Sequence, residues 1–196
     1  MTLRISGNRP LKTLGGQNTR PTLARVREAV FNIWQGKITD CRWLDLCAGT
    51  GSMGAEALCH GAAFVLGIEK SGRACRIIQQ NWEQIAQPEQ HFQVMRADVI
   101  TQLGKLTTEP FDQIYFDPPY DSDLYQPVLS AIVQHHLLAT TGEIAVEHRP
   151  NQTPDPIAGL EICRQKVYGN TALTFYRKEG KRLSCKRQEV RDKSLS

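Results

Sequence analysis

The tetrapeptide Asp117-Pro118-Pro119-Tyr120 contains the residue types of this chain that point most directly to chemistry. It follows an apolar run, residues 114–116, that is typical of a buried strand, so it stands where that strand ends and the chain turns. Two consecutive prolines remove two backbone donors and stiffen the turn. We therefore expect the carboxylate of Asp117 and the carbonyl of Pro118 to be fixed acceptors beside an aromatic ring. This suits the planar amino group of a nucleobase, because the acceptors take its N–H groups while the ring stacks on its face.

A second motif is a glycine-rich turn about seventy residues upstream of the tetrapeptide. Gly49, Gly51 and Gly54 have the spacing of a dinucleotide-binding turn. Glu69 closes the next predicted strand, where an acid accepts the ribose hydroxyls of a cofactor. Nicotinamide binding is one interpretation, but a dehydrogenase of this type usually needs a second domain. S-adenosylmethionine is favoured because Asp45 would attract its cationic amino acid end and repel a pyrophosphate.

Predicted strands and helices alternate along the chain. The strands fall near 42–46, 63–68, 91–96, 111–117, 143–147, 160–167 and 171–177. The helices fall near 53–60, 71–86, 99–106 and 124–137, after a first helix that begins at residue 22. This rhythm predicts an α/β fold with a mostly parallel, doubly wound, seven-stranded sheet. A tight turn at residues 168–170 indicates an antiparallel last strand, and residues 2–6 and 11–14 are predicted to form an N-terminal β-hairpin.

Four acidic residues stand at the ends of successive predicted strands. They are Asp45, Glu69, Asp98 and Asp117. The carboxyl ends of parallel strands meet at one edge of a sheet, and ligands bind outside that edge. The sequence therefore predicts that these four carboxylates line one binding site.

The charge is distributed unevenly. The chain carries a net charge of +4, yet residues 1–27 contain six basic side chains and no acid, and residues 177–196 carry eight basic side chains and three acids. The segment between these two ends is consequently acidic. An acidic central domain with two basic ends is typical of a catalytic domain that is held against a polyanion such as RNA.

Composition narrows the class of protein further. The chain of 196 residues is 40% hydrophobic, which suits one domain with a substantial core. It has no apolar stretch long enough to cross a membrane and no signal peptide at residues 1–4. The six cysteines show no CxxC pair, so we expect reduced thiols, no metal site and a cytoplasmic protein.

The chain resembles the RsmD family of bacterial methyltransferases, which modify the exocyclic N2 amine of a guanine in 16S ribosomal RNA. The resemblance covers roughly residues 3–177 and rests on three motifs: the segment from Arg20 to Asn32, the loop from Asp45 to Gly54, and the tetrapeptide. It implies a Rossmann-like class I methyltransferase fold, S-adenosylmethionine as the cofactor, and small-subunit ribosomal RNA or an assembling 30S particle as the partner. A monomer that needs neither metal nor membrane is expected.

The resemblance also implies boundaries and residue roles. Residues 1–19 would be a basic, RNA-contacting hairpin extension and 20–178 the methyltransferase domain. Residues 179–196, which the resemblance does not cover, are expected to be a basic, flexible tail. The cofactor would be held by Asp45, Ala48, Gly49, Gly51, Glu69 at the ribose and Asp98 at the adenine amino group, with Thr22, Arg25 and Phe31 near its methionine end. Asp117, Pro118, Pro119 and Tyr120 would hold the target base. Arg4, Arg9, Lys12 and Arg20 would bind RNA phosphates.

Other interpretations remain open at this point. Asp117 could be a solvated residue of a rigid turn, Asp98 could simply cap the next helix, and Arg25 could be a solvated helix residue. A DNA adenine-N6 methyltransferase could use the same tetrapeptide, although such enzymes usually carry a recognition domain. A protein glutamine methyltransferase typically has Asn where Asp117 stands. A non-enzymatic RNA-binding assembly factor with a relict cofactor pocket is the third alternative.

Overall fold

The computed structural model describes residues 3–14 and 24–180, so Arg20, Thr22 and Cys185 lie outside the described residues. The strands are β1 (Leu3–Ile5), β2 (Arg9–Leu11), β3 (Arg42–Leu46), β4 (Phe64–Glu69), β5 (His91–Arg96), β6 (Phe111–Phe116), β7 (Leu138–His148), β8 (Leu160–Tyr168) and β9 (Thr171–Lys178). The helices are α1 (Ala24–Ile33), α2 (Ser52–Cys59), α3 (Gly72–Ile85), α4 (Val99–Leu103) and α5 (Tyr125–Gln134), and one 3₁₀ turn, Ser6–Asn8, separates β1 from β2.

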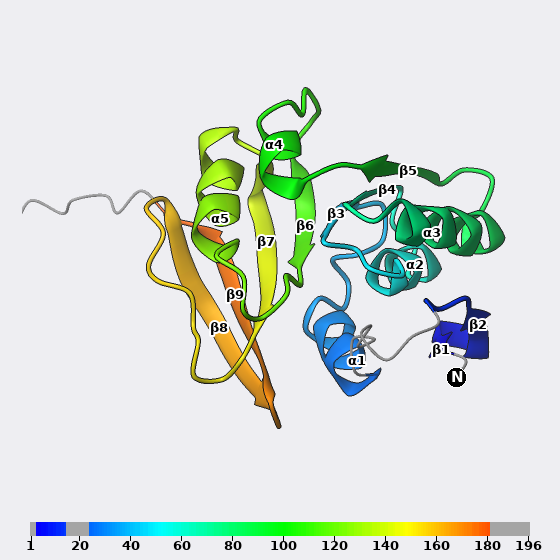
Figure 1. Cartoon of the computed structure of the whole chain (residues 1–196), viewed down its shortest axis with the longest axis horizontal. Helices are drawn as coiled ribbons and strands as arrows, with labels where there is room; N and C mark the ends of the chain where they lie inside the picture. The colour runs from blue at the N-terminus through cyan, green and yellow to red at the C-terminus, as the bar shows by residue number, and fades with distance from the viewer. Residues whose placement is uncertain (1–2, 15–23, 181–196) are drawn as a thin grey trace, which may run out of the picture.

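The described residues form a seven-stranded sheet and a separate two-stranded hairpin (Figure 1). The strand order of the large sheet is β5-β4-β3-β6-β7-β9-β8. Strands β3 to β7 pair in parallel, whereas β9 runs antiparallel to both β7 and β8. The predicted fold class, its antiparallel last strand and the N-terminal hairpin β1–β2 are thereby confirmed.

The boundary between α5 and β7 differs most from the prediction. The helix ends at Gln134 instead of residue 137, and β7 begins at Leu138 instead of residue 143. His136 adopts a left-handed backbone conformation with φ of 54°, which ends the helix. The N–H of Leu137 then donates to the carbonyl of Ile132 at 3.0 Å, and the chain enters the sheet directly.

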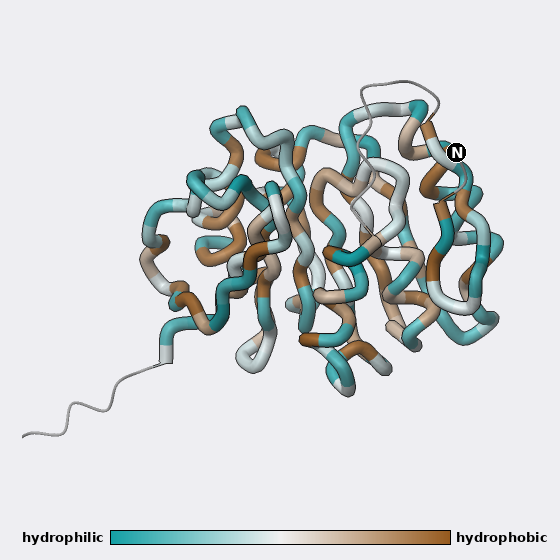
Figure 2. Tube along the Cα trace, turned by 90° about the horizontal axis from the view of Figure 1, so that it is seen from below, coloured by the Kyte–Doolittle hydropathy of each residue, from teal (hydrophilic) through white to brown (hydrophobic). Residues whose placement is uncertain are grey.

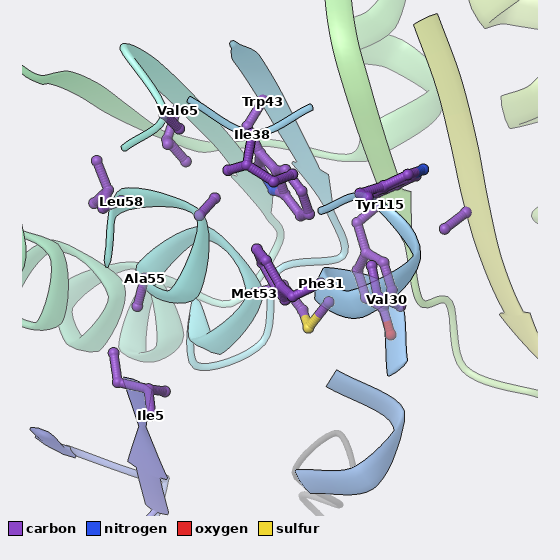
Figure 3. Packing of buried hydrophobic residues seen from close by; sticks show 14 of the residues in the cluster. Ile5, Val30, Phe31, Ile38, Trp43, Met53, Ala55, Leu58, Val65 and Tyr115 are labelled. Atoms are coloured by element: carbon purple, nitrogen blue, oxygen red, sulfur yellow. The ribbon is translucent and has the colours of Figure 1, made fainter. Parts of the chain in front are cut away.

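The sheet is covered on both faces, because its strands alternate between two apolar clusters. Trp43, Val65 and Tyr115 point to the face that carries α1, α2 and α3 (Figure 3). Their strand neighbours, such as Leu44 and Ile114, point to the face that carries α4 and α5. Buried strands of a parallel sheet are expected to be apolar on both faces. In Figure 2, hydrophobic segments (brown) lie within the body of the molecule, and many of its outer loops are hydrophilic (teal).

The hairpin packs against α2 and α3. Ile5 and Leu11 are 5% and 3% exposed and belong to the same cluster as the helices. Asn81 of α3 accepts a hydrogen bond from the N–H of Lys12 at 2.9 Å and donates to its carbonyl at 3.1 Å. The basic hairpin is therefore fixed to the rest of the domain by apolar burial and by hydrogen bonds from a side chain of α3 to its backbone.

Two further findings concern the described residues alone. Among residues 3–14 and 24–180, no helix is long and apolar enough to cross a membrane. Within the same ranges, no group of three or more histidine, cysteine or acidic side chains is arranged to hold a metal ion.

Candidate active site at the carboxyl edge of the sheet

The glycine-rich loop leaves β3 through a tight, strained path. Cys47, Gly49 and Gly51 adopt positive φ angles of 58°, 55° and 71°, and the N–H of Gly51 donates to the carbonyl of Ala48 at 2.7 Å. A Cβ on Gly49 would meet only the carbonyl of Cys47, at 3.9 Å. The backbone of this loop is therefore open to close approach by a ligand, which is what a cofactor loop requires.

Gly54 has a different role, which is packing. A Cβ on Gly54 would stand 2.2 Å from the ring of Trp82, which is fully buried. The indole N–H of Trp82 donates to the carbonyl of Gly51 at 2.8 Å. The third glycine of the motif thus lets α2 lie against α3, and the tryptophan in turn holds the loop.

Glu69 joins the loops that follow β3 and β4. One carboxylate oxygen accepts from the N–H of Gly49 at 2.9 Å, and the other accepts from the N–H of Ser71 at 2.8 Å. The residue is half-buried at the end of β4. Its carboxylate is thus fixed beside the open face of Gly49, as expected for a ribose-binding acid.

Asp45 lies beneath the loop. It is 2% exposed, and its carboxylate accepts from the N–H of Gly54 at 3.0 Å, in the first turn of α2. Burial raises the pKa of Asp45 to about 8, although the hydrogen bond from Gly54 opposes this shift. The contact of Asp45 with a cationic cofactor end remains a prediction, while its observed contact stabilises the start of α2.

Asp98 caps α4, as the simpler interpretation of this residue expected. Its side chain accepts from the N–H of Thr101 at 3.3 Å, and Lys70 lies 3.6 Å away. The hydrogen bond from Thr101 is the main reason why the pKa of Asp98 is lowered. A role at the adenine amino group is compatible with this position and stays a prediction.

The four strand-end acids converge, as the sequence predicts. Burial and, to a smaller extent, nearby carboxylates together raise the pKa of Cys47 to about 12. Those carboxylates belong to Glu69, Asp117, Asp45 and Asp98, in decreasing order of effect. All four acids therefore lie close enough to act on one thiol at the carboxyl edge of the sheet.

The tetrapeptide begins directly after β6. The N–H of Asp117 donates to the carbonyl of Leu46 at 3.4 Å, so Asp117 lies beside the last residue of β3 and next to the glycine-rich loop. Pro118 is buried, whereas Pro119 is exposed and its carbonyl accepts from the N–H of Ser122 at 3.0 Å. The rigid turn expected from the two prolines is present, and it places the base-binding candidates next to the cofactor candidates.

Glu147 is a residue of this site that the sequence analysis missed. It stands near the end of β7, is 5% exposed, and accepts a hydrogen bond from the hydroxyl of Tyr120 at 2.8 Å. It is a further acid at the end of a buried strand, which is the pattern that identified Asp45 and Glu69. The predicted strand 143–147 ends on this residue, so the same strand-end pattern in the sequence could have identified it.

Two further predicted residues are described by the structure. The guanidinium of Arg25 lies against Gly169, in the turn between β8 and β9, and its contact with the cofactor stays a prediction. Phe31 stacks on Trp43 with ring centroids 5.3 Å apart and on His60 at 5.0 Å. These rings lie near the start of β3 and the end of α2, and a contact of Phe31 with the cofactor's methionine end or the loops around it stays a prediction. The apolar ring of Phe31 belongs to the core.

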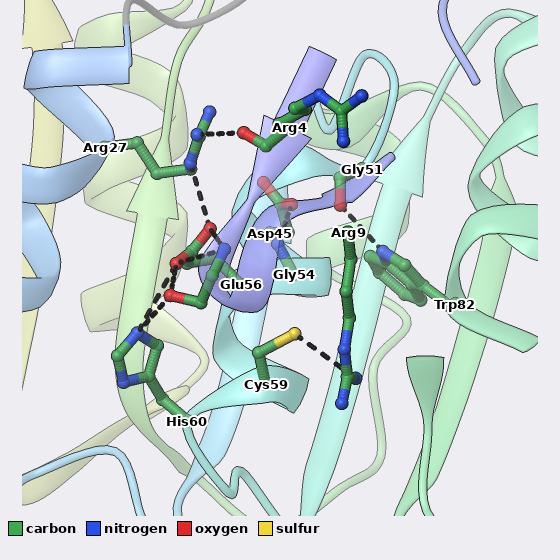
Figure 4. A network of polar contacts seen from close by, with 11 residues as sticks. Arg4, Arg9, Arg27, Asp45, Gly51, Gly54, Glu56, Cys59, His60 and Trp82 are labelled. Atoms are coloured by element: carbon green, nitrogen blue, oxygen red, sulfur yellow. Dashed lines mark hydrogen bonds and ion pairs between the residues drawn. The ribbon is translucent and has the colours of Figure 1, made fainter. Parts of the chain in front are cut away.

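The three basic hairpin residues that the structure describes are all exposed. Arg4 donates to the carbonyl of Asn8 at 2.9 Å, and Lys12 donates to the side chain of Gln80 at 2.9 Å. Arg9 extends toward Cys59, with its nitrogen 3.8 Å from the sulfur (Figure 4). In none of these three contacts is the cation paired with a carboxylate. The predicted contacts of Arg20 and Thr22 fall outside the described residues.

The chain is similar to a protein family and to named relatives. The model of the family described as conserved hypothetical protein 95 matches residues 3–177. YlbH of Bacillus subtilis (strain 168), provisionally named an rRNA methyltransferase, is 32% identical over 182 residues, which cover 90% of this chain and 98% of YlbH. Ribosomal RNA small subunit methyltransferase D of Escherichia coli (strain K12) is 28% identical over 187 residues, which cover 89% of this chain and 93% of the relative.

Solved structures give the same result. The structure of yhhF from Escherichia coli, provisionally described as a methyltransferase, has a TM-score of 0.80 at 28% identity and covers 91% of this chain and 99% of its own. SMU.776, described as complexed with SAH, has a TM-score of 0.59 at 14% identity, a likeness that shows the fold alone.

The sheet topology, the glycine-rich loop and the tetrapeptide together define a methyltransferase of the Rossmann-like class. This chain belongs to the conserved hypothetical protein 95 family, and its expected resemblance to the RsmD family is confirmed. The relatives named as methyltransferases support S-adenosylmethionine as the cofactor.

Proposed function

We propose that this protein transfers a methyl group from S-adenosylmethionine to the exocyclic N2 amine of a guanine in small-subunit ribosomal RNA. The observation that carries the proposal is the position of Asp117, which follows β6 and is bonded to the end of β3. Asp117 and the carbonyl of Pro118 would then form a fixed acceptor pair close to the cofactor loop at Gly49. The relatives named above as rRNA methyltransferases support the choice of RNA as the substrate.

The cofactor half of the site is built from the ends of β3 and β4. Glu69 would hold the ribose hydroxyls, since its carboxylate already faces the loop through Gly49 and retains free lone pairs. Gly49 would let the ligand approach the backbone closely, and Gly51 would take part through its backbone alone, because Trp82 lies 2.8 Å from where its Cβ would be. The bound cofactor supplies an electrophilic methyl group, and the protein supplies orientation and charge.

The base half of the site is the tetrapeptide. The N2 amine of guanine is a poor nucleophile because its lone pair is delocalised into the ring. Hydrogen bonds from this amine to Asp117 and to the carbonyl of Pro118 would localise the lone pair toward the methyl group. Holding nitrogen and methyl carbon in line supplies most of the catalysis. Asp117 would then accept or relay the proton that the amine loses, while Tyr120 stacks on the flipped base.

The basic hairpin would bind the RNA backbone. Arg4, Arg9 and Lys12 are exposed on an element that Asn81 and Glu56 fix to the core, so phosphate contacts there would set the position of the RNA relative to the site. Such contacts contribute affinity that falls with rising salt. Arg20 would add to this surface.

A methyl-transfer assay tests the proposal. Purified protein and radiolabelled S-adenosylmethionine are incubated separately with small-subunit particles, naked ribosomal RNA, duplex DNA and ribosomal protein, and the labelled residue is identified after digestion. We expect N2-methylguanine in ribosomal RNA. Label in adenine of DNA or in glutamine of protein would keep the fold and overturn the substrate, and no label on any acceptor would favour an RNA-binding assembly factor.

A further inference from the structure

Three tyrosine hydroxyls converge on Glu147. Its two carboxylate oxygens accept separate hydrogen bonds, one from Tyr120 at 2.8 Å and one from Tyr115 at 2.7 Å. Its backbone carbonyl accepts from the hydroxyl of Tyr125 at 3.3 Å. These tyrosines belong to β6, to the tetrapeptide and to α5, so a single residue of β7 joins three segments around the proposed base site.

Burying the carboxylate of Glu147 costs free energy that packing alone does not require. A carboxylate that is 5% exposed loses most of its hydration, and that loss is offset only if its oxygens are hydrogen-bonded. The two oxygens of Glu147 are satisfied by two neutral phenols, Tyr115 and Tyr120. Burial, the largest influence on Tyr120, raises the pKa of this phenol to about 12, so its hydroxyl stays a donor at neutral pH. An apolar residue at position 147 would fill the space without requiring these bonds.

The ring of Tyr120 is held from several sides. Its hydroxyl oxygen also lies 3.0 Å from the hydroxyl of Thr171 on β9. The guanidinium of Arg149 lies 5.6 Å from the centroid of its ring, and Arg149 is itself paired with Asp121 at 3.0 Å. A tyrosine ring turns about two side-chain torsions, and contacts at its far end leave little freedom in either.

The tyrosines held by Glu147 line a pocket. Tyr120 and Tyr125 are part of the wall of a cavity of about 510 Å³, which also contains Gln126 and Gln152. Ligand sites of this size accept nucleotide-sized groups, with aromatic rings for stacking and a few polar groups for orientation. The cavity adjoins the tetrapeptide on the side where β7 ends.

We infer that Glu147 is a positioning residue that fixes Tyr120 and Tyr125 as the aromatic wall of a pocket for a nucleobase of the substrate RNA. It acts through the tyrosines and does not touch the base itself. The inference rests on the proposed function, because the pocket receives RNA only if RNA is the substrate. Glu147 lies outside the tetrapeptide, yet the geometry of the tetrapeptide depends on it.

Single and double variants test this role. Glu147→Gln and Tyr120→Phe are made separately and together, and kcat and KM for small-subunit particles are measured with saturating S-adenosylmethionine. Each single variant is expected to lower kcat/KM by about tenfold, and the double variant by no more than the worse single one, because both changes break the same contact. The affinity for S-adenosylmethionine should stay unchanged in all three.

Two controls separate positioning from general stability. Glu161→Gln changes an exposed acid of β8 that pairs with Arg177, and it should leave the kinetics unchanged. Tyr115→Phe removes the hydroxyl that donates to the second oxygen of Glu147, so it should lower the melting temperature. Its effect on kcat/KM should be much smaller than that of Tyr120→Phe. Binding of particles to the protein saturated with S-adenosylhomocysteine gives a readout that does not depend on turnover, and it should weaken for Tyr120→Phe.

The outcomes are distinguishable. If the wild-type protein methylates particles while Glu147→Gln and Tyr120→Phe retain kcat/KM within about twofold, the inference is overturned and the proposed function stands. Losses that add fully in the double variant also overturn it, since they indicate independent effects. Absence of methyl transfer by the wild-type protein overturns the proposed function itself.

Discussion

The Nε of Arg27 donates a hydrogen bond to Oε2 of Glu56 at 3.0 Å, and both side chains are buried (Figure 4). A second nitrogen of Arg27 donates to the carbonyl of Arg4 at 2.6 Å. The backbone N–H and the hydroxyl of Ser6 both donate to Glu56, and His60 lies 3.4 Å from it. One buried ion pair therefore joins α1 and α2 to the basic hairpin.

Removal of Glu56 tests the importance of this ion pair. We expect Glu56→Ala to lower the free energy of unfolding by about 3–5 kcal/mol, because Arg27 would remain as a buried charge without its carboxylate. Chemical denaturation measures this loss. The control is Glu109→Ala, since Glu109 lies 3.8 Å from Arg42 with a largely exposed side chain and should matter little. Equal effects of the two substitutions would show that the buried pair is not what stabilises the hairpin.

Asp117 is expected to be essential for turnover. Asp117→Ala removes the carboxylate that we assign to the substrate amine, so methyl transfer should fall by at least about a hundredfold. Cofactor affinity, measured by calorimetry, should change little, because the cofactor contacts are assigned to the loops after β3 and β4. Near-normal turnover in this variant would contradict the mechanism.

Glu69 is expected to control cofactor affinity. Glu69→Gln keeps the size of the side chain but replaces one acceptor oxygen by an amide donor, which would face the N–H of Gly49 or of Ser71. We expect the Kd for S-adenosylmethionine to rise by about 10- to 100-fold. The matched control is Glu83→Gln, on the exposed face of α3, where the carboxylate accepts a hydrogen bond from Gln79 at 2.8 Å. An unchanged Kd in Glu69→Gln would remove Glu69 from the cofactor site.

Gly54 is predicted to be intolerant of any side chain. In Gly54→Ala the new methyl group would stand 2.2 Å from the ring of Trp82, which is enclosed on all sides, so we expect a loss of about 1–3 kcal/mol or more. Gly104→Ala is the control, because a Cβ there meets its nearest atom, on His135, at 3.5 Å and the backbone is already helical. Thermal unfolding of both variants makes the comparison, and equal melting temperatures would show that α2 and α3 can separate without cost.

Asp45 gives the stability of the cofactor-free protein a specific pH dependence. Burial raises its pKa from 3.8 to about 8, so between these values the folded state binds a proton that the unfolded state has released. The contribution of Asp45 to the free energy of unfolding is therefore full below about pH 4 and is lost progressively as the pH rises toward 8.

The substitution Asp45→Asn removes this titration. Only the wild-type protein must ionise a buried acid as the pH rises. The stability of the variant relative to the wild-type protein should therefore increase between about pH 5 and pH 8, which lies roughly between the two pKa values of Asp45. Urea titrations at a series of pH values measure the difference. Parallel curves for the two proteins across this range would contradict a raised pKa.

Much of the fold followed from local patterns. The apolar runs of β3, β4 and β6 are strands because buried parallel strands are apolar on both faces. The acids at or next to the ends of these strands had to meet at one edge of the sheet. The glycine-rich loop was recognisable for a similar reason, since only glycine tolerates the positive φ and the close approach that Gly51 shows.

Tertiary structure alone decided which distant side chains meet. Glu147 reaches Tyr120 because β7 lies next to β6, and Thr171 reaches the same hydroxyl because β9 lies next to β7; neither neighbour relation is encoded in the periodicity of a strand. Phe31 is a core residue for the same reason, since its position depends on where α1 packs. Periodicity reports which face of an element is buried, whereas the partner on that face depends on strand order and on the packing of segments far apart in the chain.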